Sequence, residues 1–103
     1  LFVHEAGAAY DDDVDAEGEV HDDGRVAWLD GHLRAARAAI DDGVDLRGFF
    51  VWSLLDNFEW AHGYSRRFGL VFVDYPTLAR VPKQSFYWYR DLIASQRAQA
   101  AAA

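Results

Sequence analysis

Apolar residues in the stretch Val26–Ile40 recur at intervals of three and four. The five positions are Val26, Leu29, Leu33, Ala36 and Ile40. This spacing places them on one face of a helix, with polar residues on the other face. Asp22 or Asp23 precedes the stretch where an N-cap is expected, and Gly43 follows it as a C-cap would. The pattern predicts an amphipathic helix packed on one side.

Two apolar runs flank this helix. Leu1–His4 is typical of a short buried strand that ends in a turn at Glu5–Gly7. Leu46–Leu55 is rich in Phe, Val, Trp and Leu and shows no alternation with polar residues. Such a run is typical of a strand buried on both faces, as in parallel sheets covered by helices. Strand, helix and buried strand together predict a βαβ unit in an α/β fold.

The C-terminal part predicts a small hairpin and a second helix. Residues 70–73 and 80–81 are apolar and flank a turn-forming segment, Asp74–Thr77. A helix is expected after Pro82. Its apolar face carries Phe86, Tyr89 and Ile93, with Leu92 beside them. We assign residues 1–97 to one structural segment and expect residues 98–103, which offer nothing large to bury, to fray.

Composition narrows the classes of function. The 103 residues are 51% hydrophobic and 16% aromatic, which indicates a packed core and not a disordered chain. Seventeen acidic residues against ten basic ones give a net charge of −7, which argues against binding to nucleic acid or to an anionic membrane. Cysteine is absent, which excludes disulfides and thiol chemistry. The longest apolar stretch, Gly48–Leu55, is too short to span a bilayer.

The N-terminal sequence bears on processing and location. The chain begins with Leu1 and enters an apolar run at once, as a piece cut from a longer protein would. No basic region followed by an apolar region is visible, so we expect no signal peptide and a cytoplasmic location.

Glu5 is the first candidate for chemistry. It lies where the first strand is expected to emerge into a loop, and ligands of parallel α/β folds bind at the carboxyl ends of strands. The competing interpretation is a carboxylate that caps a neighbouring backbone group or meets water.

A second candidate follows the other buried strand. Trp52, Asp56, Asn57, Glu59 and Trp60 combine indoles, an amide and carboxylates within nine residues. Sugars present flat C–H faces and a rim of hydroxyls, so their sites pair aromatic platforms with hydrogen-bonding groups. The competing interpretation is an aromatic cluster at the edge of the core.

A third candidate is a calcium loop. Asp11, Asp13 and Asp15 have the alternate spacing with which such loops begin. However, Ala16 stands at the sixth position and Asp22 at the twelfth, where Gly and a bidentate Glu are expected. The four histidines have no metal-ligand spacing, and we expect His21 and His32 at the surface. They are His4, His21, His32 and His62.

One long motif resembles a known family. The nine residues Trp52–Trp60, with Gly63-Tyr64 and then Arg67–Leu70, look like the signature near the C-terminus of glycoside hydrolase family 1, the β-glucosidase family. The likeness extends upstream through Glu5–Tyr10 and downstream through Val73–Tyr75, Pro82-Lys83 and the Trp88-Tyr89 helix. It therefore covers most of the chain.

The resemblance implies a TIM (β/α)8 barrel of which this chain is the βαβα part that holds the seventh and eighth strands with their helices. Barrels of this type need about 250 residues, so the 103 residues form an incomplete one. By position Glu5 resembles the catalytic nucleophile, which the family holds in a Thr-Glu-Asn-Gly context. Here His4 and Ala6 replace the flanking Thr and Asn. No cofactor and no metal is expected.

The resemblance also implies a sugar site. Trp52 matches the family's platform under the non-reducing sugar, Glu59 and Trp60 match partners of its hydroxyls, and Phe68 matches an aromatic lining of the same pocket. The peptide bond between Trp52 and Ser53 is cis in family members. The implied substrate is a β-glycoside or oligosaccharide.

Retaining glycosidases use two carboxyl groups about 5 Å apart, one as nucleophile and one as general acid/base. In the family the acid lies in an Asn-Glu-Pro motif, which this chain does not contain. We therefore expect the chain alone to be inactive and to require the missing N-terminal portion of the barrel as its partner. The alternatives are an inactive remnant that serves as a binding or assembly module, and a calcium-binding loop protein.

Overall fold

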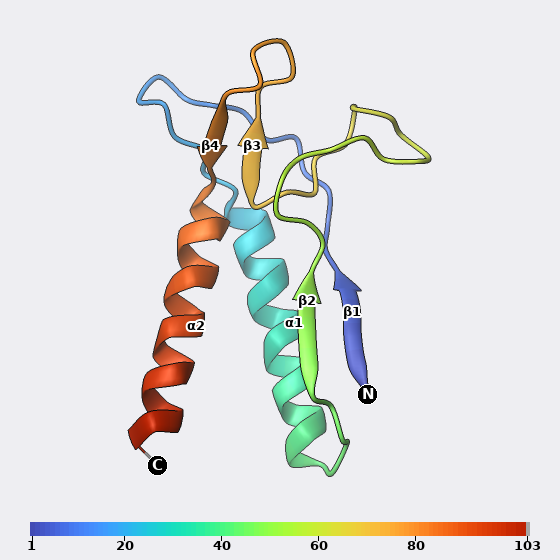
Figure 1. The fold of residues 1–103 in the computed structure, drawn as a ribbon, viewed down its shortest axis with the longest axis vertical. Coiled ribbons are helices and arrows are strands. Elements are labelled where there is room, and N and C mark those ends of the chain that lie inside the picture. Colours follow the sequence, from blue (N-terminus) through green and yellow to red (C-terminus); the bar gives the residue numbers. More distant parts are fainter. Residues whose placement is uncertain (103) are drawn as a thin grey trace.

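The computed structural model describes residues 1–102, which form four strands and two helices (Figure 1). In chain order they are β1 (Phe2–Ala6), α1 (Asp23–Asp41), β2 (Gly48–Val51), β3 (Val71–Val73), β4 (Arg80–Pro82) and α2 (Gln84–Ala102). Residue 103 lies outside the described residues. None of the helices in this part of the chain has the length and apolarity needed to cross a membrane.

The predicted βαβ unit is confirmed. β1 and β2 pair in parallel, and α1 connects them. Phe2 pairs with Gly48 and Val3 with Phe49, whereas the next pair is Ala6 with Val51. β1 thus advances three residues where β2 advances two, and a bulge falls at His4 and Glu5. A bulge changes the direction in which side chains leave the strand.

The sheet is open on one face, which corrects the expectation that the second strand is buried on both faces. Phe50 is 56% exposed and Trp52 is 40% exposed, whereas Phe49 and Val51 are half-buried. Two strands with helices on one side leave the other side uncovered (Figure 1). A continuous apolar run indicates that both faces of a strand need to be buried. The helices of this chain cover only one of these faces.

The ends of α1 differ in part from the prediction. Asp22 occupies the N-cap position but makes no capping hydrogen bond with its side chain, which binds Arg25 and Ser85 instead. At the other end Gly43 follows as predicted, and its N–H donates to the carbonyl of Ile40 at 3.0 Å. Leu29 on the predicted apolar face is fully buried.

The hairpin and the last helix complete the core. β3 and β4 pair antiparallel around the Asp74–Thr77 turn, as predicted. Most of the buried apolar residues belong to β3 and to the residue before it, with Val20 before α1 and Leu29 within α1; they are Val20, Leu29, Leu70, Val71, Phe72 and Val73. Residues 98–102, expected to fray, continue α2 as an exposed helix.

Candidate functional site

The carboxyl ends of β1 and β2 meet directly. The backbone N–H of Trp52 donates to the carbonyl of Ala6 at 2.9 Å. The residue that follows β1 is Gly7, and a Cβ there would stand 2.0 Å from the carbonyl oxygen of Trp52, so only glycine fits at this position. Glu5, in β1, and Trp52, directly after β2, therefore lie at the same end of the parallel sheet.

Trp52 and Glu59 form the best-defined contact among the expected sugar-binding residues. The indole Nε1 donates to Oε1 of Glu59 at 3.1 Å. Glu59 is held by a tight turn, in which its N–H and carbonyl pair with the carbonyl and N–H of Gly63 at 2.8 and 2.7 Å. The peptide bond between Trp52 and Ser53 is cis, as the resemblance implies.

The other expected residues stand outside this contact. Trp60 is at the tip of the turn and is 98% exposed. Phe68 is half-buried, and its carbonyl accepts the N–H of Ser53 at 3.3 Å, next to Trp52. Glu5 is exposed and lines a groove between β1 and α1, which Trp52 and Trp60 do not line. A two-stranded sheet cannot close a cavity around both strand ends.

Asp56 and Asn57 bind other groups of the chain and do not face an open site, unlike the expectation for this loop. Asp56 is buried; its Oδ1 accepts from Gly69 N and Lys83 Nζ, and its Oδ2 accepts from Arg67 Nη1 and Val73 N. Asn57 donates through Nδ2 to Ser53 Oγ at 3.0 Å. Both side chains fix the loop that carries Trp52 and Glu59.

Sequence reasoning missed the partners of Asp56. Arg67 lies against the rings of Phe72 and Tyr75, with its Cζ atom 4.0 and 4.6 Å from their centroids. Burial raises the pKa of Tyr75 above its usual value. Lys83 is fully buried, and its Nζ lies 2.6 Å from Asp12 Oδ2 and 2.8 Å from Asp56 Oδ1. No periodicity connects residues so far apart in the chain.

The same cluster continues into α1. Arg25 is nearly fully buried and contacts Asp12 at 2.9 Å and Asp22 at 2.6 Å. Burial lowers the pKa of Arg25, but the two carboxylates outweigh it and the net change is upward. Asp22 also accepts from the N–H and the hydroxyl of Ser85 at 2.9 and 2.5 Å.

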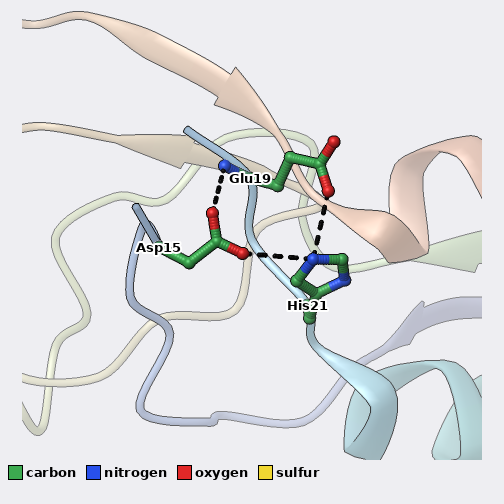
Figure 2. A group of neighbouring side chains, drawn as sticks. All are labelled: Asp15, Glu19 and His21. Carbon is green, nitrogen blue, oxygen red and sulfur yellow. Dashed lines mark hydrogen bonds and ion pairs between the residues drawn. The ribbon is translucent and has the colours of Figure 1, made fainter. Parts of the chain in front are cut away.

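The acidic loop does not bring together Asp11, Asp13 and Asp15, the carboxylates of the candidate calcium loop. Within residues 1–102, the grouped metal-ligating side chains are Asp15, Glu19 and His21, all exposed (Figure 2). His21 Nε2 lies 3.1 Å from both Asp15 Oδ2 and Glu19 Oε2. The backbone N–H of Glu19 is the main cause that lowers the pKa of Asp15. His21 and His32 are exposed, as predicted.

Comparison with known proteins places this geometry in context. Residues 1–98 match the family model described as glycosyl hydrolase family 1. β-Glucosidase A of Thermotoga maritima is 54% identical over 93 residues, which are 90% of this chain and 21% of that protein. A bifunctional β-D-glucosidase/β-D-fucosidase of Bifidobacterium breve is 50% identical over 103 residues, 96% of this chain and 22% of that protein.

Solved structures agree. The family 1 β-glucosidase from Thermotoga maritima in complex with isofagomine lactam superposes with a TM-score of 0.89 at 54% identity, over 90% of this chain and 21% of the other. The chain thus spans about a fifth of the length of these relatives. It is a small α/β piece of the kind found in their TIM barrels and does not close a barrel itself.

Proposed function

The chain belongs to glycosyl hydrolase family 1, and we propose that it is the part of a retaining β-glucosidase that carries the nucleophile and the loop binding the non-reducing sugar. β1 and β2 are then the seventh and eighth strands of the barrel, followed by α1 and α2. The complete barrel hydrolyses terminal β-D-glycosidic bonds. The relatives named as β-glucosidases support this reaction class.

One observation carries the proposal. The hydrogen bond from Trp52 N–H to the Ala6 carbonyl places Glu5 and the Trp52–Glu59 pair at the same carboxyl edge of a parallel sheet. Active sites of β/α barrels lie at that edge. Further strands that pair with the edges of this sheet close the barrel and supply the walls that bring the two groups to one sugar.

The chemistry follows from Glu5. Its carboxylate oxygen forms a bond to the anomeric carbon while the bond to the departing oxygen breaks, and that oxygen takes a proton from a second carboxylic acid. Water then attacks the same carbon, gives its proton to the second carboxylate, and releases Glu5. This second group belongs to the rest of the barrel, because the chain lacks the Asn-Glu-Pro motif.

The remaining residues hold the sugar. Trp52 supplies an apolar platform for the ring, and Glu59 accepts hydrogen bonds from its hydroxyls. Its bond to Trp52 uses Oε1 at 3.1 Å, which orients the second oxygen relative to the platform. Trp60 and Phe68 complete the pocket when the barrel closes over them.

The rest of the barrel is the proposed partner of this chain. A groove of about 580 Å³ between β2 and α2 is lined largely by apolar side chains, among them Phe50, Phe86 and Ile93. The open sheet face exposes Phe2 as well. These apolar surfaces suit the strand and helices that continue a barrel. We propose that the isolated chain does not turn over substrate.

The test is a barrel chimera, in which residues 1–98 of this chain replace the matching segment of Thermotoga maritima β-glucosidase A. We expect the chimera to hydrolyse an aryl β-glucoside, and Glu5→Gln to abolish that activity. Glu17→Gln, in the exposed acidic loop, is the matched control. Activity that survives Glu5→Gln contradicts the proposal.

A second candidate function rests on His4 and Ala6, which flank Glu5 where the family has Thr and Asn. These departures favour a remnant that binds or assembles without catalysis. A chimera that binds isofagomine lactam but gains turnover only when both positions are restored supports this candidate.

A further inference from the structure

The loop that carries Trp52 and Glu59 is tied down by a buried ammonium group. Lys83 is fully buried at the start of α2, and a lysine is almost never buried without charged partners. Its partners are Asp56, four residues after Trp52, and Asp12, in the segment after β1. Lys83 therefore bridges the two segments that follow the neighbouring strands.

The bridge leaves Asp56 little freedom. Four donors occupy its two oxygens, and two of them are the backbone N–H groups of Gly69 and Val73. Gly69 packs so closely that a Cβ there would stand 2.3 Å from Asp56 N. The loop backbone is thus fixed against the segment that leads into β3.

The bridge is also anchored on its far side. Arg25 of α1 contacts Asp12 and Asp22, and Asp22 binds Ser85 of α2. The charged side chains in contact form a series in which acidic and basic groups alternate, and their formal charges sum to zero. The groups in order are Asp22, Arg25, Asp12, Lys83, Asp56 and Arg67, of which Arg67 is half-buried and the others are buried. In Figure 1 the segments that carry them converge beyond the carboxyl ends of β1 and β2.

We infer that Lys83 is a positioning residue, which sets the placement of the Trp52–Glu59 pair relative to the strand that carries Glu5. It acts through Asp56 and Asp12 and does not touch the sugar. This inference rests on the proposed function of the pair. Misplacement of a binding group by about 1 Å lowers rates by about 100-fold, so loss of the bridge is expected to be costly.

The experiment uses the barrel chimera with Lys83→Met, which keeps the length of the side chain and removes its charge. We expect kcat/KM for an aryl β-glucoside to fall by about 100-fold. Arg37→Met removes a cation from an exposed ion pair on α1 and is the matched control, expected to leave kcat/KM unchanged.

A double-mutant cycle separates positioning from general destabilisation. If Lys83 positions Glu59, Lys83→Met lowers kcat/KM by less than about threefold in a Glu59→Gln background, since the group that it positions is already lost. The same penalty in both backgrounds overturns the inference. Asp12→Asn with Lys83→Met keeps the buried charges balanced and serves where the single variant does not fold.

A spectroscopic readout separates this inference from the proposed function. In chimeras labelled with 5-fluorotryptophan, the fluorine signal of Trp52, assigned with Trp52→Phe, should shift in Lys83→Met and not in Arg37→Met. An unshifted signal overturns the inference, whether or not the chimera turns over substrate. Loss of hydrolysis in the unsubstituted chimera, with the shift intact, overturns the proposed function alone.

Discussion

The indole Nε1 of Trp52 donates a hydrogen bond to Oε1 of Glu59, seven positions later in the chain, at 3.1 Å. The bond joins the flat apolar surface and the hydrogen-bond acceptor that a pyranose site needs into one unit. The bond fixes each of the two side chains relative to the other. Removal of the indole N–H group of Trp52 therefore tests how much this bond contributes to activity.

Trp52→Phe keeps an aromatic platform and removes the donor to Glu59. A hydrogen bond to a charged group is worth about 1.5–3 kcal/mol, so kcat/KM of the chimera should fall by about 10- to 100-fold. Steady-state kinetics on an aryl β-glucoside measure this. Trp88→Phe on α2 is the control and should change kcat/KM by less than about twofold.

The residues beside Glu5 give a prediction of opposite sign. Ala6 offers no hydrogen-bonding side chain, whereas the family has Asn there. His4→Thr with Ala6→Asn should raise kcat of the chimera by about tenfold or more, since a donor near developing charge stabilises the transition state. An unchanged or lower kcat would show that the flanking residues do not limit the reaction.

Much of this arrangement is legible in the sequence because it is local. The three-and-four spacing from Val26 to Ile40 predicts α1, and the resemblance of the Trp52–Trp60 motif to a known family implies the cis bond that follows Trp52. The bulge at His4 and Glu5 is not legible, since one extra residue in a short apolar strand leaves no pattern.

The pairing of the buried charged side chains could also not be predicted from the sequence. Asp56 looks like an open sugar acceptor because it stands between aromatic residues, yet Lys83, 27 residues away, occupies it. The one indication in the sequence is Lys83 itself, a lone lysine directly after Pro82, where a helix is expected to begin. Pairing between distant charges depends on the tertiary fold and shows in no local spacing.

Two glycines provide a matched test of packing. Gly69→Ala places a Cβ 2.3 Å from Asp56 N, so we expect the free energy of unfolding to fall by about 3 kcal/mol. Gly31→Ala, at an exposed position of α1 with nothing within 4 Å of the added Cβ, should raise it by about 1 kcal/mol through helix propensity. Urea unfolding of both chimeras checks the two signs. Equal effects would contradict the close approach at Gly69.

The lowered pKa of Asp15 predicts that the stability of the protein depends on pH. Backbone N–H groups lower its pKa from the ordinary 3.8, so its contribution to stability is present above that value and is lost as the pH falls through the folded pKa. Asp15→Asn should flatten the fall of Tm in that acid range, while Asp13→Asn in the same loop should not. An equal fall of Tm with decreasing pH in the wild type and in Asp15→Asn would contradict this account.

The most direct measurement is the identity of the carboxylate that bonds to the sugar. The barrel chimera is incubated with an activated 2-deoxy-2-fluoro-β-glucoside, which slows release of the glycosyl-enzyme, then digested and analysed by mass spectrometry. The account predicts a peptide carrying one sugar on Glu5. A chimera that hydrolyses aryl β-glucosides yet carries the sugar on another residue, or on none, would contradict it.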